Sequence, residues 1–130
     1  MDPASLEGVP LFSDLSRRDR RLVARHADEV EIQQGTHLTE QGRLAYELFV
    51  IQDGIADVII DGERVSSLGP GDVAGEIGVL RGSHRTATLV ATTPMRLIVM
   101  YGPELLALSE ELPELFAELE RIVAERSTRS

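Results

Sequence analysis

Between residues 48 and 100, short apolar runs alternate with glycine-containing turns, and this pattern constrains the fold more than any other feature of the chain. The pairs Asp53-Gly54 and Asp61-Gly62 each follow an apolar run, which is typical of a tight hairpin. Gly69-Pro70-Gly71 makes a further turn. Many short strands with regular turns favour a mainly β fold, a jelly-roll β-barrel. The strand-like runs are residues 48–51, 55–60, 64–68, 86–91 and 96–100.

Apolar residues at helical spacing flank this β region on both sides. We expect an N-terminal helical segment over residues 9–30, with Ser16 as the N-cap of a helix that begins at Arg17. The barrel then occupies residues 31–101, and leucines recur at intervals of three and four through residues 103–126. Pro113 divides that last stretch into two helices. Residues 1–130 are therefore predicted to form a single domain with helices before and after the barrel.

Composition excludes several classes of protein. The 130 residues are 42% hydrophobic, enough for one domain with a real core. The chain has no cysteine, so it has neither a disulfide framework nor a thiolate metal site. We expect a cytoplasmic domain with no membrane span, because no apolar run approaches about 20 residues and no signal peptide is evident. The net charge of −9 disfavours direct binding to nucleic acid.

The segment from residue 75 to 88 has the composition of a phosphate site. Gly75 and Gly78 leave room for an anion to approach the backbone at a helix start, where unpaired N–H groups and the helix dipole favour negative charge. Arg85 supplies a fork of donors for phosphate oxygens. Glu76 can only accept, so it suits a hydroxyl. An anion and a hydroxyl beside small residues together describe a sugar phosphate.

This segment resembles the phosphate-binding cassette of cyclic nucleotide-binding domains, in which Gly-Glu is followed some residues later by Arg, small residues and Thr. The similarity extends over residues 9–123. At the N-terminal side of that range, Leu11–Ser16 resembles the family's entry helix. Turn glycines also fall where the family places them, at Gly35, Gly42, Gly54 and Gly71. Departures from the family pattern occur at Ala74, Arg43, Tyr46 and His84.

The resemblance implies a regulatory sensor that binds cAMP or cGMP, not an enzyme, with no further cofactor and no metal. It implies that binding moves the C-terminal helix, which passes the signal to an effector domain or a second copy of the chain. It also implies that Leu119, Ile122 or Val123 covers the base and that Thr86 influences the choice of base. The ligand-binding residues it indicates are Gly75, Glu76, Ile77, Gly78, Arg85, Thr86, Ala87 and Val58.

Each of these interpretations has a simpler alternative. Arg85 could be a surface residue in a weak ion pair, and Val58 and Ala87 could be plain barrel core. A domain with the same barrel and no ligand, acting through interactions alone, is the main competing hypothesis. A cupin-like metalloenzyme would need paired histidines, and His26, His37 and His84 form no such pair.

Overall fold

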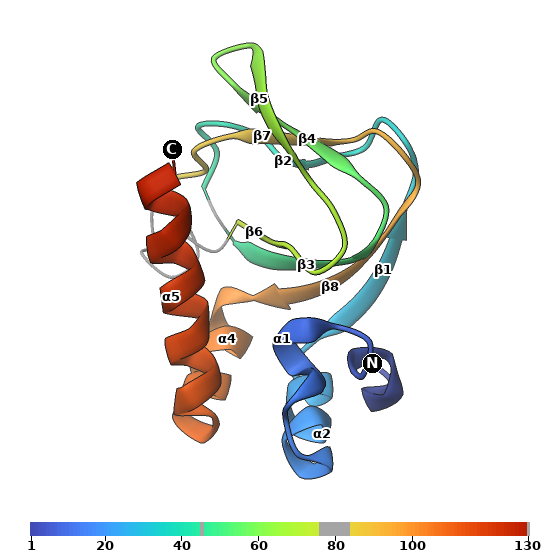
Figure 1. The fold of residues 1–130 in the computed structure, drawn as a ribbon, viewed down its shortest axis with the longest axis vertical. Coiled ribbons are helices and arrows are strands. Elements are labelled where there is room, and N and C mark those ends of the chain that lie inside the picture. The colour runs from blue at the N-terminus through green and yellow to red at the C-terminus, as the bar shows by residue number, and fades with distance from the viewer. Residues whose placement is uncertain (45, 76–83, 130) are drawn as a thin grey trace.

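The computed structural model describes residues 1–44, 46–75 and 84–129, without the side chains of residues 120 and 123–129. It consists of two four-stranded antiparallel sheets that face each other, with helices at both ends of the chain (Figure 1). One sheet has the order β1-β8-β3-β6 and the other β2-β7-β4-β5, so the predicted mainly β, jelly-roll architecture with flanking helices is confirmed. The strands are β1 Asp28–Ile32, β2 His37–Thr39, β3 Glu47–Asp53, β4 Ala56–Ile60, β5 Glu63–Leu68, β6 Val73–Ala74, β7 Thr88–Ala91 and β8 Met95–Tyr101.

The central strands β3 and β8 are largely apolar because their sheet is covered on both faces. Successive strand residues point to opposite faces. Leu48 and Val50 of β3 therefore join the core beneath the helices, while Phe49 and Ile51 join the core between the two sheets. β8 alternates in the same way. The β1-β8-β3-β6 sheet thus lies between most of the helices and the second sheet, as Figure 1 shows.

The two Asp-Gly pairs have different roles. Asp61 and Gly62 both have positive φ, 52° and 82°, and form the two-residue turn between the paired strands β4 and β5, as predicted. The hairpin predicted at Asp53-Gly54 is wrong, because β3 and β4 belong to different sheets. Gly54, with φ 93°, instead passes so close to Pro94 and Met95 that no Cβ would fit.

The N-terminal helices, α4 and the beginning of α5 lie on the outer face of the β1-β8-β3-β6 sheet, and the rest of α5 continues beside the barrel (Figure 1). Ser16 caps α2 as expected, its Oγ accepting from the Asp19 N–H at 3.1 Å. The helical segment expected over residues 9–30 ends earlier, at Arg25, because Asp28–Ile32 pairs with β8. Pro113 begins the last helix, as predicted. The helices are the 3-10 helix η1 Pro3–Leu6, α1 Pro10–Ser13, α2 Arg17–Arg25, α4 Gly102–Glu111 and α5 Pro113–Arg129.

Candidate functional site

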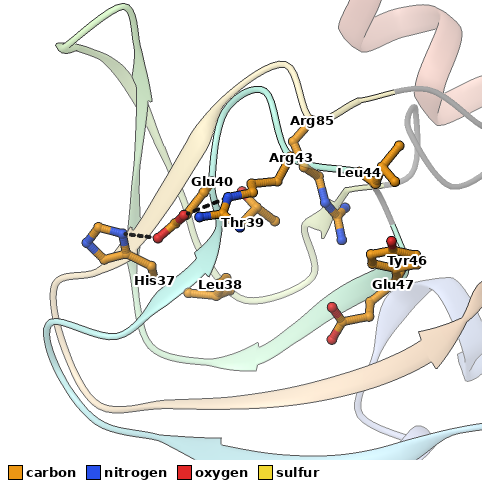
Figure 2. Close-up of a pocket in the computed structure, with 9 residues that line it drawn as sticks. All are labelled: His37, Leu38, Thr39, Glu40, Arg43, Leu44, Tyr46, Glu47 and Arg85. Atoms are coloured by element: carbon orange, nitrogen blue, oxygen red, sulfur yellow. Dashed lines mark ion pairs between the residues drawn. The ribbon is translucent and has the colours of Figure 1, made fainter.

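A cavity of about 310 Å³ lies between β2 with its following loop, the start of β3, and Arg85. Figure 2 shows the Arg85 side chain pointing toward Tyr46 and Glu47. The size suits a small ligand. The lining residues are His37, Leu38, Thr39, Glu40, Arg43, Leu44, Tyr46, Glu47 and Arg85.

Arg85 is the buried cation of this site, only 7% exposed. Its Nη1 donates to the Gly75 carbonyl at 3.1 Å, and its guanidinium carbon lies 5.8 Å from the centre of the Phe49 ring, within cation–π range. An arginine keeps its charge when buried. The structure therefore places a permanent positive charge in a mostly enclosed position within an acidic protein.

The backbone of Arg85 is held by the loop between β2 and β3. Its N–H donates to the Arg43 carbonyl at 2.7 Å, and its carbonyl accepts from the Gly42 N–H at 3.0 Å. Gly42 has φ 85°, a left-handed conformation that favours glycine. These two hydrogen bonds join segments that are distant in the sequence, and they fix the base of the Arg85 side chain in the cavity wall.

Gly75 makes room for the Arg85 guanidinium. Its φ is 80°, and a Cβ built on it would overlap Arg85 Nη1 and lie 2.8 Å from the Glu47 carbonyl oxygen. The sequence predicts that Gly75 lets an anion approach. In the structure, the space that its missing side chain leaves is occupied by the arginine that would receive the anion. Gly75 and Arg85, both predicted site residues, are thus brought into contact.

The loop after β2 is the part of the site that sequence reasoning missed. Thr39 Oγ1 donates to the Ala87 carbonyl and the Gln41 N–H donates to Thr88 Oγ1, both at 3.0 Å, so the loop is fastened to the strand that follows Arg85. The turn glycine at residue 42 was the available signal. Pairing between strands that are distant in the sequence brings this loop to the cavity, and no local sequence pattern indicates that pairing.

The cavity has a charged wall and an apolar wall. Glu40 pairs with both His37, at 3.6 Å, and Arg43, at 3.4 Å, as the dashed lines in Figure 2 mark. These pairs are exposed and contribute little to stability. On the opposite wall lie two exposed side chains, Leu44 at 50% and Tyr46 at 63% exposure.

The remaining predicted ligand-binding residues are not all at this cavity. Glu76, Ile77 and Gly78 lie outside the described residues. Thr86 is exposed directly after Arg85, and Ala87 is half-buried. Val58 packs against the core between the sheets. Leu119 is buried and Ile122 half-buried against the core beneath the helices, and the side chain of Val123 is not described.

Neither a metal centre nor a membrane-spanning helix is present in the described part of the chain. Within residues 1–44, 46–75 and 84–129, no three His, Asp or Glu side chains gather as metal ligands would. Over the same residues, none of the helices combines the length and the apolar character that crossing a bilayer requires.

Comparison with known proteins shows which family this domain belongs to. The family model of the cyclic nucleotide-binding domain matches residues 29–111, more than half of the chain. The chain belongs to this family. The family is non-catalytic, so the expectation of a regulatory domain instead of an enzyme is confirmed, and the ligand that the family implies is a cyclic nucleotide.

Individual relatives contain the domain within larger proteins. The cAMP-dependent protein kinase regulatory subunit of Schizosaccharomyces pombe is 32% identical over 99 residues, 75% of this chain and 24% of that protein. The crystal structure of the Thermus thermophilus catabolite activator protein superposes with a TM-score of 0.82 at 26% identity, covering 92% of this chain and 59% of that one. The chain spans less than a third of the length of the curated relatives it matches.

A third relative with the same fold is described as belonging to a cAMP-independent kinase. The regulatory subunit of a cAMP-independent protein kinase A from Trypanosoma brucei has a TM-score of 0.77 at 23% identity, covering 91% of this chain and 44% of that one. At that identity the likeness shows the fold alone. The fold therefore does not by itself specify the nucleotide.

Proposed function

We propose that this chain is a cytoplasmic regulatory domain that binds cAMP, with cGMP as the alternative ligand. The observation that carries the proposal is Arg85, a buried cation in the wall of a cavity of about 310 Å³. The net charge is −9, so most of the surface repels anions, and the attraction must be local. A planar guanidinium pairs bidentately with phosphate, which matches the single charge of a cyclic phosphate.

The cassette would bind the rest of the sugar phosphate. We assign backbone contacts to Gly75, Ile77 and Gly78, the ribose hydroxyl to Glu76, and contacts around the base to Thr86 and Ala87. The regulatory subunit from S. pombe, by its name cAMP-dependent, supports adenine as the first choice. Val58 would lie further along the space between the sheets, and Leu119, Ile122 or Val123 would cover the base from the last helix.

A hydrogen bond links the cavity wall to the start of the C-terminal helices. The carbonyl of Tyr46, a lining residue, accepts from the N–H of Gly102, the first residue of α4, at 3.0 Å. Glu47, the next lining residue, lies opposite Tyr101 in the pairing of β3 with β8. A ligand drawn toward Arg85 would therefore press on the segment to which α4 is attached. Binding would shift the population toward states with the last helices closed over the base.

Calorimetric titration of the purified chain with cAMP and with cGMP tests the proposal. Arg85→Ala removes the buried donor and should weaken binding by about 2–5 kcal/mol, roughly thirtyfold to several thousandfold. Arg85→Lys keeps the charge without the fork and provides a second, less disruptive variant. Arg96→Ala is the matched control, because Arg96 is an exposed arginine on β8 that pairs only with Glu31 among the described residues.

The outcomes separate the two hypotheses. Binding by the wild type and by Arg96→Ala, with loss in both folded Arg85 variants, supports a phosphate contact at Arg85. A folded wild-type chain that binds neither nucleotide at millimolar concentration favours the domain that keeps the barrel and acts through interactions alone. Full affinity in folded Arg85→Ala places the phosphate elsewhere.

A further inference from the structure

Helix α2 carries a stripe of arginines on its exposed side. Arg17, Arg18, Arg21 and Arg25 are all exposed, and at about 100° per residue they fall within one arc of the helix. In the part of the chain that the structure describes, none of the four makes an ion pair or a side-chain hydrogen bond. The nine residues of α2 hold five arginines and one aspartate, a net charge of +4 in a protein whose total is −9.

The C-terminal helices carry the opposite charge. α4 and α5 together hold seven glutamates and three arginines, a net charge of −4. Glu110, Glu111 and Glu114, around the turn between α4 and α5, are exposed and likewise make no ion pair with a described residue. Leu106 on the same helix α4 is 64% exposed, a large apolar side chain left in solvent.

These two charged surfaces lie at the same end of the molecule. Figure 1 shows α2, α4 and the beginning of α5 below the β1-β8-β3-β6 sheet, at the end away from the second sheet. His26 and Glu104 join α2 and α4 through a hydrogen-bonded contact. The arginines and the three glutamates thus belong to one layer, and they do not neutralise each other within the described part of the molecule.

We propose that this helical end is a self-association surface, in which α2 of one copy packs against the α4–α5 turn of a second copy. A twofold axis makes such a contact twice, since each copy offers both the arginine stripe and the glutamates. Leu106 lies on the acidic helix and would be covered in the same contact. The surface is self-complementary in charge, which favours a second copy as the partner.

Other partners fit the observations less well. A nucleic acid or an anionic bilayer would meet the arginines but would also meet the glutamates beside them, and the whole chain is acidic. The proposed contact uses none of the residues that line the cavity. It also uses different residues from those proposed to cover the base.

Ionic strength and pH define the conditions of the test. Two copies with a net charge of −9 repel each other at low salt, while high salt screens the contact pairs themselves. A concentration of about 0.1 M salt, with a screening length of about 10 Å, shortens the range of the repulsion and leaves close pairs effective. Every basic side chain outside the histidines is arginine, so the charge of the stripe does not change near neutral pH.

Sedimentation equilibrium at rising protein concentration measures the association. We expect the wild type to dimerise, and Arg18→Glu/Arg21→Glu to raise the dissociation constant by more than about tenfold through like-charge contacts. Glu110→Arg/Glu111→Arg should do the same from the other side. Mixing the two variants should restore association in a mixed dimer, because each then offers the complement of the other. Arg64→Glu/Arg96→Glu, with the same change in net charge as the first variant but on the sheets, is the matched control.

Three results would overturn the proposal. The first is a wild type that remains monomeric up to about millimolar concentration, whether or not it binds vesicles of anionic lipid or duplex DNA instead. The second is a pair of charge-reversed variants that fail to associate with each other although both are folded by circular dichroism. The third is equal loss of association in the control variant, which would show that net charge alone is responsible.

Discussion

Replacing Gly75 by alanine should damage the site more than any comparable change at another turn glycine. The chain offers a matched control in Gly62, because the two residues have nearly the same φ, 80° and 82°. A Cβ on Gly62 would meet nothing within 4 Å, whereas a Cβ on Gly75 would overlap Arg85 and crowd the Glu47 carbonyl at 2.8 Å. The pair separates the effect of backbone conformation from the effect of crowding.

The expected magnitudes follow from these contacts. Placing an L-residue in the left-handed region costs about 1–2 kcal/mol at either position. At Gly75 the guanidinium must also leave, which breaks the hydrogen bond from Arg85 to the Gly75 carbonyl, and a hydrogen bond to a charged group contributes about 1.5–3 kcal/mol. Gly75→Ala should therefore lower the free energy of unfolding by about 2 kcal/mol more than Gly62→Ala. In a domain of this size that difference corresponds to about 8 °C in Tm.

Thermal unfolding followed by circular dichroism measures the first effect, and calorimetric titration with cAMP measures the second. Gly62→Ala should bind like the wild type, while Gly75→Ala should bind at least about tenfold more weakly, since Arg85 no longer occupies its place. Equal losses in Tm for the two variants, or unchanged affinity in Gly75→Ala, would contradict the conclusion that Gly75 accommodates Arg85.

Three further predictions concern the ligand and the core. Leu119→Ala should lower the free energy of unfolding by about 2–5 kcal/mol in a urea titration, because Leu119 is 1% exposed in the core beneath the helices; a loss below about 1 kcal/mol would contradict that packing. The 2′-deoxy analogue of cAMP should bind at least several-fold more weakly than cAMP, since the proposed Glu76 contact would lose a hydrogen-bond partner worth about 1–3 kcal/mol. Equal affinities would remove Glu76 from the ribose. Thr86→Ala should weaken cGMP more than cAMP by less than about tenfold, the worth of one neutral hydrogen bond, and an unchanged preference in competition binding would show that the base is recognised elsewhere.

Much of the architecture is predictable because it depends on local chemistry. Ser16 accepts a hydrogen bond from three residues away, Pro113 cannot continue a helix, and Asp61-Gly62 adopts the positive φ values of its turn. The glycines and the arginine of the cassette likewise indicate the cyclic nucleotide-binding family, which the family model confirms. In each case the signal consists of residues that lie close together in the chain.

The chemistry of each side chain fixes which residues can form the site, whereas long-range contacts fix how these residues meet. Asp53-Gly54 looks like Asp61-Gly62 in the sequence, yet it joins two sheets, because the outcome depends on which strands β3 and β4 pair with across the barrel. Arg85 is held by Gly42 and Arg43, and its guanidinium fills the space left by Gly75. Those contacts depend on strand pairing between distant segments, whose free energy comes largely from burying two cores together. No pattern of neighbouring residues in the sequence indicates which distant strands will pair.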